Sequence, residues 1–295
     1  MYDVIVVGAG PTGSFIASRL AELGYRVIVL EQKEGAGENI CCTGIISVEC
    51  FNTFNLEATI LREASSAKFF APGGEFIRLE RESPQAYIID RASLDKSLRE
   101  RAQRYGASYL FSAPAVSLTP ETDCVSATVD YHGKQRTFTA RAVVLACGFG
   151  SVLPEKIGLG EIADFVSGAQ AEVDTIDLDE VEVYWDQNLF PGSFGWLVPT
   201  KQDKGLAGLL APKNPALYLR NFLHHLRAQG KIASTEADMK FGIVPLRTLA
   251  RTYSDRIIVV GDAAGQVKPT TGGGIYYGLL CADIAVACLR QAFSG

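Results

Sequence analysis

The sequence predicts an α/β protein in which a domain with a parallel sheet is interrupted by a second domain with an antiparallel sheet. An apolar strand, a glycine-rich turn and a helix occupy the first residues of the chain, and the same order recurs near its end. Between them, from about residue 161 to 243, short runs of alternating polar and apolar residues replace this pattern. Such alternation is typical of antiparallel strands with one solvated face.

The N-terminal turn carries the spacing G-x-G-x-x-G. Residues 2–7 are apolar and β-branched, and Gly8, Gly10 and Gly13 then lead into an amphipathic helix. A second apolar strand ends at Glu31. In this context the three glycines predict a Rossmann-type turn that admits a pyrophosphate, with the acidic residue hydrogen-bonded to a ribose. We therefore expect an ADP-containing cofactor, and the negative charge of Glu31 disfavours NADP in this site.

The second turn follows an apolar run at Ile257–Val260. Gly261 and Asp262 end this strand, and glycines at 272–274 precede a long apolar helix at about 275–293. The N–H groups at a helix start and the positive end of its dipole suit a partly negative ligand. The alternative is an ordinary βα turn in which Asp262 caps a helix.

These two turns can meet only if the chain returns to its first domain. A ligand held by both must be extended, which favours FAD, with its ADP half and its flavin half bound by different segments. The predicted discontinuous FAD-binding domain comprises residues 1–65, 86–160 and 246–295. The predicted substrate-covering domain, with the antiparallel sheet, comprises residues 66–85 and 161–245.

Several other elements are predicted. A helix capped by Asp90 begins near Arg91, and residues 107–118 and 124–131 indicate strands. Residues 137–139 and 140–146 predict two further strands, the second of which ends at Cys147-Gly148. The carboxyl end of a buried strand is where open α/β sheets bind ligands. A further helix is predicted over 217–229.

Composition excludes several classes of protein. The net charge of −5 provides no basic patch, so nucleic acid is not an expected partner. Seven cysteines without framework spacing fit reduced thiols in the cytoplasm, and three histidines make no metal-ligand pattern. The chain begins directly on a strand without a signal-like segment. The last helix, interrupted by Asp283 and Arg290, is expected to be a core helix too short to span a bilayer.

Three motifs carry a resemblance to a known family. The Gly8 fingerprint, the segment Asp90-Arg91 with Leu94-Asp95, and the Gly261-Asp262 turn look like the flavin signatures of the para-hydroxybenzoate-hydroxylase-like flavoproteins. Within that group, residues 261–275 most closely resemble the geranylgeranyl reductase family. Two further stretches support this resemblance. They are Phe194-x-Trp196-x-x-Pro199, with Val198 where the family usually has Phe, and Cys42-Thr43-Gly44.

The resemblance implies roles for individual residues. Arg91 would lie near the phosphates, the backbone at Ala115 or Val116 would face the adenine, and Asp262 would hold the ribityl chain. Phe194 and Trp196 would wall an apolar pocket, and Cys42 is the candidate for a residue near the reaction. The complete predicted set of cofactor contacts is Gly8, Gly10, Pro11, Thr12, Gly13, Glu31, Cys41, Cys42, Thr43, Gly44, Arg91, Ala115, Val116, Gly148, Gly261, Asp262, Gly273, Gly274 and Ile275.

The implied activity is an FAD-dependent reductase that saturates carbon–carbon double bonds of an isoprenoid group by hydride transfer from reduced flavin. The sequence has no second nucleotide fingerprint, so NAD(P)H or a protein electron donor would act transiently. The alternatives are a monooxygenase or halogenase of the same fold, and a non-catalytic flavin-binding or electron-relay subunit. An apolar substrate favours peripheral contact with a membrane, although no basic amphipathic helix supports an anchor.

Besides Val198, the sequence departs from this family in two places. Cys147-Gly148 stands where Asp-Gly is more usual. Family members also continue beyond the helix that here ends near Phe293, so part of the prenyl-tail cavity is expected to be absent from these residues or supplied by a partner.

Overall fold

The computed structural model describes residues 1–35 and 40–294. The chain forms two compact units, each assembled from separate segments. Unit 1 comprises Met1–Glu38, Ala92–Asp164 and Val244–Gly295, and unit 2 comprises Asn39–Arg91 and Phe165–Ile243. Residues 40–65 and 86–91 were expected in the first domain, whereas they belong to unit 2. The reason is that β3 (Ile45–Ser47) and β4 (Ile60–Ala64) both pair with β7 (Ala86–Ile89).

Unit 1 is built on an eight-stranded sheet with the order β17-β18-β11-β1-β2-β8, to which β10 and β9 are added beside β11. The strands β18, β11, β1, β2 and β8 run parallel, as the fold class predicts. Most of their apolar side chains are buried, which is typical of a parallel sheet covered on its faces. The bounds are β1 (Tyr2–Val7), β2 (Val27–Leu30), β8 (Ser108–Leu110), β9 (Ala115–Pro120), β10 (Val125–Tyr131), β11 (Lys134–Leu145), β17 (Tyr253–Ser254) and β18 (Ile257–Val259).

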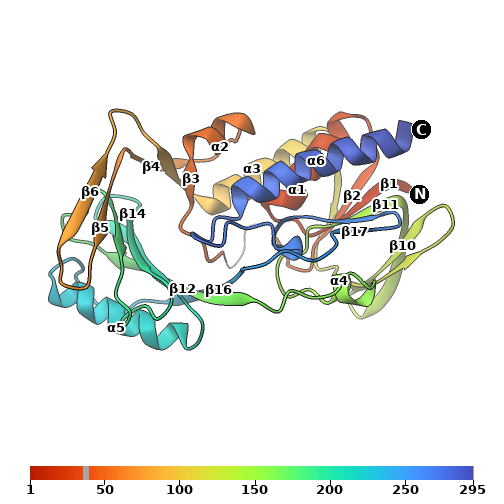
Figure 1. The fold of residues 1–295 in the computed structure, drawn as a ribbon. Coiled ribbons are helices and arrows are strands. Elements are labelled where there is room, and N and C mark those ends of the chain that lie inside the picture. The colour runs from red at the N-terminus through yellow and green to blue at the C-terminus, as the bar shows by residue number, and fades with distance from the viewer. Residues whose placement is uncertain (36–39, 295) are drawn as a thin grey trace. The chain divides into compact units, whose positions relative to one another are not determined.

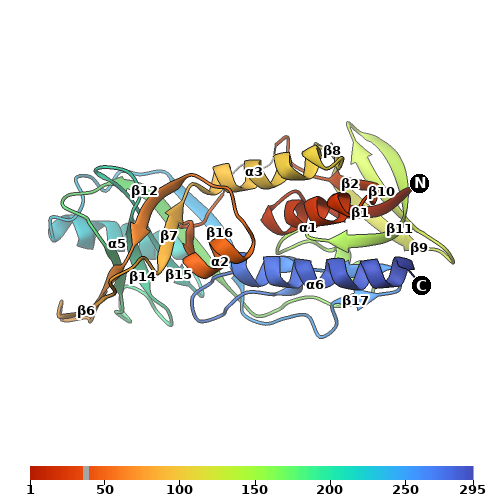
Figure 2. The same ribbon diagram turned by 90° about the horizontal axis from the view of Figure 1, so that it is seen from above.

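Three helices run side by side along one face of this sheet (Figures 1 and 2). They are α1 (Pro11–Glu22), α3 (Arg91–Arg104) and α6 (Ile275–Ser294), and two short helices, α4 (Leu153–Lys156) and the 3-10 helix η1 (Gly261–Ala264), complete the unit. Helix α1 packs directly against α6, so the first and last helices of the chain share one core.

Two strand predictions in unit 1 are wrong in detail. Residues 107–118 form two strands, β8 and β9, because Ser112 adopts a left-handed conformation with φ 51° between them. The runs at 137–139 and 140–146 form one long strand, β11. Its first half pairs with β10 and its second half with β1, so a single strand serves both an antiparallel hairpin and the parallel sheet.

The range of α6 agrees with the prediction of a helix at about 275–293, but the conclusion about its length relative to a membrane does not hold. With 20 residues and an apolar composition, α6 is long enough to cross a membrane by those two criteria alone. One face of α6, which includes Leu279, Ala282 and Val286, is buried within unit 1. The opposite face carries exposed apolar residues, among them Leu280 and Ile284. The expectation that this segment is too short is therefore wrong, whereas its role as a packed helix of unit 1 is confirmed.

Unit 2 contains a seven-stranded sheet with the order β16-β12-β15-β14-β13-β5-β6. Strands β12, β15, β14 and β13 pair antiparallel in succession, whereas β13 and β5 pair parallel, which the sequence did not indicate. The bounds are β5 (Ser66–Phe70), β6 (Phe76–Glu80), β12 (Phe165–Asp174), β13 (Val181–Tyr184), β14 (Gly195–Pro199), β15 (Lys204–Ala211) and β16 (Met239–Pro245). The short helix α2 (Val48–Thr53) follows β3.

The two faces of this sheet have different neighbours. Helix α5 (Pro215–Ala228) covers one face, where Phe190 and Phe222 are fully buried with ring centroids 4.8 Å apart. On the other face Val181 and Val198 pack with Ile88 of β7. Because successive side chains of a strand alternate between faces, Trp196 lies on the face that carries Val198.

Candidate functional site

The turn after β1 has room for glycine alone at two positions. Gly8 has φ 108°, and a Cβ atom there would lie 2.3 Å from the carbonyl oxygen of Ala146. A Cβ atom at Gly13 would lie 2.0 Å from the carbonyl oxygen of Gly8. Real side chains do not tolerate such distances, so these glycines are required for β1, β11 and α1 to approach one another.

Gly10 has the opposite surroundings. It is the N-cap of α1, and apart from its two chain neighbours no atom of the described residues lies within 4 Å of a Cβ atom built there. Pro11 and Thr12 form the first turn of α1, where backbone N–H groups have no partner in their own helix. An open approach to the N-terminus of a helix suits a phosphate group. The residues present therefore fit the pyrophosphate of a dinucleotide.

Glu31 holds the end of β2 against this turn. Its carboxylate is 8% exposed and accepts hydrogen bonds from the backbone N–H groups of Ala9, at 2.7 Å, and Lys33, at 2.9 Å. A carboxylate has about four acceptor positions, so two remain for the hydroxyl groups of a ribose. The buried charge is thus a fixed acceptor beside the glycine turn.

The second glycine-bearing turn converges on the first, as the sequence analysis predicted. A Cβ atom at Gly261 would lie 3.0 Å from Oγ1 of Thr12, and one at Gly278 in α6 would lie 2.6 Å from the same atom. Residues from α1, η1 and α6 therefore meet at the Thr12 side chain. This contact brings segments about 250 residues apart into one site.

Asp262 and the start of α6 form the other end of this site. The Asp262 side chain is exposed, and its Oδ1 would lie 2.8 Å from a Cβ atom at Gly274. Gly273 and Gly274 directly precede Ile275, the first residue of α6. The positive end of the α6 dipole is therefore next to a carboxylate that can accept hydrogen bonds from hydroxyl groups.

The remaining predicted contacts in unit 1 lie at the edges of the sheet. Ala115 and Val116 begin β9, and the Val116 carbonyl oxygen accepts a hydrogen bond from Nζ of Lys156 at 3.1 Å. Gly148 follows β11 with φ 72°. Burial raises the pKa of the neighbouring Cys147 thiol, which keeps it neutral.

In unit 2 the predicted residues Cys41, Cys42, Thr43 and Gly44 form a segment tied to two strands. Cys41 Sγ donates to the Lys240 carbonyl oxygen of β16 at 3.5 Å, and burial raises its pKa to about 11. The backbone oxygen of Cys42 accepts from Nε2 of Gln170 in β12 at 3.2 Å. At Gly44 a Cβ atom would lie 2.3 Å from the carbonyl oxygen of Ile89, so β7 also restrains the segment.

The other predicted residues of unit 2 occupy different elements. Phe194 and Trp196 are partly buried, and their rings are 5.9 Å apart and tilted by 56°. Trp185 continues this aromatic group, 6.5 Å from Phe194. Arg91 is the first residue of α3. Gln170 was not predicted from the sequence, although a lone amide among the small and apolar residues of 168–171 was a usable signal.

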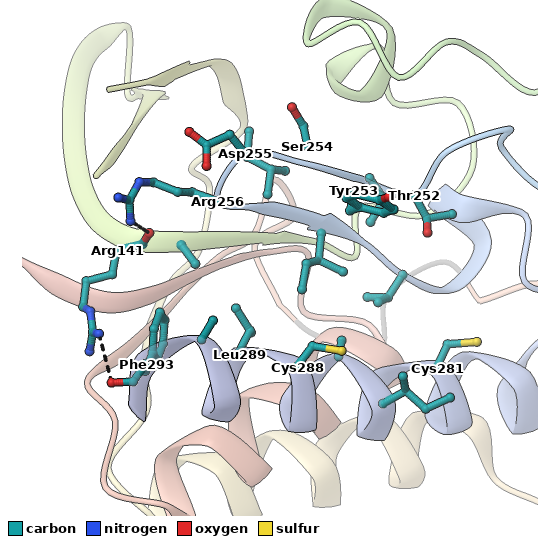
Figure 3. A pocket seen from close by; sticks show the side chains of 18 of the residues that line it. Arg141, Thr252, Tyr253, Ser254, Asp255, Arg256, Cys281, Cys288, Leu289 and Phe293 are labelled. Atoms are coloured by element: carbon teal, nitrogen blue, oxygen red, sulfur yellow. Dashed lines mark hydrogen bonds between the residues drawn. The ribbon is translucent and has the colours of Figure 1, made fainter. Parts of the chain in front are cut away.

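A separate cavity of about 610 Å³ lies in unit 1 between α6 and the strands β17 and β18 (Figure 3). Its wall on the helix side includes Cys281 and Cys288, and Arg141, Arg256 and Phe293 lie at one end. In the part of the chain that the structure describes, none of the predicted cofactor residues lines this cavity. It is therefore distinct from the glycine-bearing site.

The comparisons with known proteins agree with this geometry. The FAD-binding-domain family matches residues 1–280. A digeranylgeranylglycerophospholipid reductase of Methanocaldococcus jannaschii is 30% identical over an alignment of 296 positions, which spans 97% of this chain and 76% of that protein. Digeranylgeranylglycerophospholipid reductase 2 of Methanothermobacter thermautotrophicus is 33% identical over an alignment of 309 positions, which spans 99% of this chain and 78% of that protein.

A solved structure shows the same fold. It is a geranylgeranyl bacteriochlorophyll reductase-like protein from Thermoplasma acidophilum, with a TM-score of 0.90 and 24% identity over 99% of this chain and 79% of that chain. The fold, the two converging turns and the family match define an FAD-dependent oxidoreductase. Within that class, the chain belongs to the geranylgeranyl reductase family.

Proposed function

We propose that this protein saturates carbon–carbon double bonds of an isoprenoid group carried by a lipid. The observation that carries this proposal is the identity of 30–33%, over 97–99% of the chain, with proteins named digeranylgeranylglycerophospholipid reductases. The Phe194-x-Trp196 segment supports it, because both side chains are aromatic and only partly buried, with Trp196 on β14 and Phe194 directly before it.

The residues of unit 1 bind and orient the cofactor. The open approach at Gly10 and the start of α1 receive the pyrophosphate, and Glu31 accepts from the adenosine ribose. Asp262 accepts from the ribityl chain, and the backbone N–H groups at Gly273, Gly274 and Ile275 bind the polar end of the ring system. When bound, FAD supplies the hydride that adds to one alkene carbon.

The residues of unit 2 hold the substrate. Phe194 and Trp196 present apolar surface that holds an alkene and excludes water, which strengthens electrostatic interactions at the reacting atoms. Cys42 is the candidate for a group near these atoms, where the second alkene carbon must receive a proton. Its backbone is fixed through Gln170 and its sequence neighbours Cys41 and Gly44 are held by β16 and β7, so its position is defined.

Two electrons are consumed for each double bond, and a reductant must replace them. We propose NAD(P)H or a protein electron donor that binds transiently, because the sequence contains one dinucleotide fingerprint. A lipid substrate is membrane-borne, so peripheral contact of a cytoplasmic protein with the membrane is part of the proposal.

The test uses the purified protein reconstituted with FAD under anaerobic conditions. The flavin is reduced with dithionite and a geranylgeranyl lipid is added, while the visible spectrum is recorded and the lipid is analysed by mass spectrometry. The expected result is return of the oxidised flavin spectrum together with a mass increase of about two hydrogens for each double bond reduced. A spectrum that changes only when air enters, with peroxide or a hydroxylated product, contradicts the proposal and favours a monooxygenase.

A matched pair of variants tests whether the Trp196 side chain positions the alkene. Trp196→Ala should lower the rate of lipid-dependent reoxidation by about tenfold or more while FAD remains bound, because positioning of the alkene is lost. Trp185→Ala removes the neighbouring, more exposed ring and serves as the control. Equal rates for wild type and Trp196→Ala contradict the role proposed for this side chain.

A further inference from the structure

Three residues on adjacent strands of unit 2 lie in one row. Gln170 of β12 is directly opposite Gly208 of β15, and Gly208 is directly opposite Trp196 of β14. Residues directly opposite one another in a sheet project from the same face. The side chains of Gln170 and Trp196 therefore extend from one face of the sheet, with a residue that has no side chain between them.

The indole ring of Trp196 covers this glycine. A Cβ atom at Gly208 would lie 2.5 Å from Cε2 and 2.6 Å from Nε1 of the indole. The ring nitrogen consequently lies above β15, displaced from its own strand toward β12. Any larger residue at position 208 would move the ring, so Gly208 permits the approach of Nε1 to the Gln170 side.

Both polar groups have an unused hydrogen-bonding atom. Gln170 is 4% exposed, and its Nε2 donates to the Cys42 carbonyl oxygen. Within residues 1–35 and 40–294, the structure gives neither Oε1 of Gln170 nor Nε1 of Trp196 a hydrogen-bond partner, although both atoms are buried. Leaving a buried polar atom unpaired costs about 1–3 kcal/mol, so two such atoms on one surface indicate a shared ligand.

We propose that Gln170 and Trp196 together bind one hydroxyl oxygen between the indole N–H and the amide oxygen, beside the ring that covers Gly208, and that Gln170 thereby couples this oxygen to the Cys42 segment. An indole N–H only donates and an amide oxygen only accepts. A hydroxyl group or a water molecule satisfies both, because its oxygen accepts from Nε1 and its hydrogen is donated to Oε1. Gln170 is a positioning residue in this arrangement, since its other atom fixes the backbone of Cys42.

The geometry of this binding site comes from residues of unit 2 alone, so it can be tested separately from the reaction proposed above, although Trp196 and Cys42 belong to both proposals. The oxygen that it binds can come from two sources, a bound water molecule or a hydroxyl group of a ligand. The two sources differ in whether the oxygen is present before FAD or lipid is added.

The first measurement is the ¹⁵N–¹H spectrum of the indole group. The chain contains two tryptophans, so a Trp185→Phe background leaves Trp196 as the single indole signal. We expect a hydrogen-bonded Nε1–H resonance that shifts and exchanges with solvent about tenfold faster when Gln170→Met is added. Gln135→Met, an exposed glutamine of β11, is the matched control and should leave the resonance unchanged.

The same spectrum distinguishes the sources. A resonance that already depends on Gln170 in the apoprotein assigns the oxygen to water, and one that depends on Gln170 only after FAD or lipid is added assigns it to that ligand. If Gln170→Met leaves the shift and the exchange rate of the indole resonance unchanged in every state, the proposal is overturned. Gly208→Ala provides a second route if Gln170→Met does not fold, because it displaces the indole and should shift the same resonance.

The coupling to Cys42 has its own readout. Gln170→Glu keeps an acceptor toward the bound oxygen but removes the donor to the Cys42 carbonyl oxygen. Alkylation of Cys42, measured by peptide mass spectrometry, should accelerate about fivefold to tenfold in this variant. Trp196→Phe removes the indole N–H and should leave the alkylation rate unchanged. Equal Cys42 rates for Gln170→Glu and wild type would overturn the positioning role.

Discussion

The carboxylate of Glu31 accepts the backbone N–H of Ala9 at 2.7 Å, which joins the end of β2 to the glycine turn after β1. The charge predicted to bind a ribose therefore also fixes the shape of the adjacent phosphate site. One side chain thus sets both the geometry of the turn and its affinity for the cofactor.

Glu31→Gln should weaken FAD binding by about tenfold to a hundredfold. An amide group presents one acceptor oxygen where the carboxylate presents two, so either the Ala9 or the Lys33 N–H loses a charge-assisted hydrogen bond. Quenching of flavin fluorescence during titration of the apoprotein measures the affinity. Glu22→Gln, on the exposed side of α1, should bind FAD as wild type does. Wild-type affinity in Glu31→Gln would show that Glu31 has no role in binding.

Gly13→Ala should lower the stability of the protein, whereas Gly10→Ala should lower its affinity for FAD. At Gly13 a methyl group would contact the Gly8 carbonyl oxygen at 2.0 Å, so the apoprotein should be destabilised by about 1–3 kcal/mol. At Gly10 the space is open, so the apoprotein should melt normally while FAD affinity falls, because the methyl group occupies the phosphate approach. Thermal unfolding with and without FAD separates the two effects. A stable Gly10→Ala variant that binds FAD normally would contradict the assignment of this space.

Stability should fall at alkaline pH through Cys50. Burial, assisted by the charge of Glu49, raises the pKa of this thiol from its ordinary value of 9.0 to about 12. Above pH 9 the unfolded chain loses the proton while the folded chain keeps it, so the free energy of unfolding decreases until about pH 12. Urea unfolding between pH 8 and 11 should show a shallower decline in Cys50→Ala than in wild type. Cys288→Ala, at an exposed position of α6, should retain the wild-type slope.

Lys231→Met should destabilise the protein by about 3 kcal/mol. Lys231 Nζ lies 2.6 Å and 2.9 Å from the two oxygens of Glu182, which is 3% exposed and also accepts from the Tyr184 hydroxyl. Removal of the lysine leaves a buried carboxylate without its cation. The double variant Lys231→Met with Glu182→Leu should recover most of the loss in urea unfolding.

The control for this pair is Lys204→Met. Lys204 and Asp174 form an ion pair whose side chains are 43% and 57% exposed, so its loss should cost about 0–1 kcal/mol. If both lysine variants lose the same small free energy, the Glu182 pair is not an important buried interaction.

Much of unit 1 could be predicted because its determinants are local. Consecutive residues determine the order of strand, glycine turn and helix. A larger residue at Gly8 or Gly13 would clash with the neighbouring backbone. Convergence of the turns at Gly8 and Gly261 was also predictable, because parallel strands of one sheet place their carboxyl ends at the same edge. The break at Ser112 and the double pairing of β11 were not, since both depend on which strands become neighbours.

The sequence by itself therefore determined the cofactor class, the parallel sheet and the family of the protein. Only the tertiary structure decided that Thr12 meets Gly278, that residues 40–65 join unit 2, and that Gln170 and Trp196 share one surface above Gly208. The physical reason is register. Pairing between strands that are distant in the chain is set by the packing of the whole sheet, and a shift of one residue would move Gln170 to the opposite face.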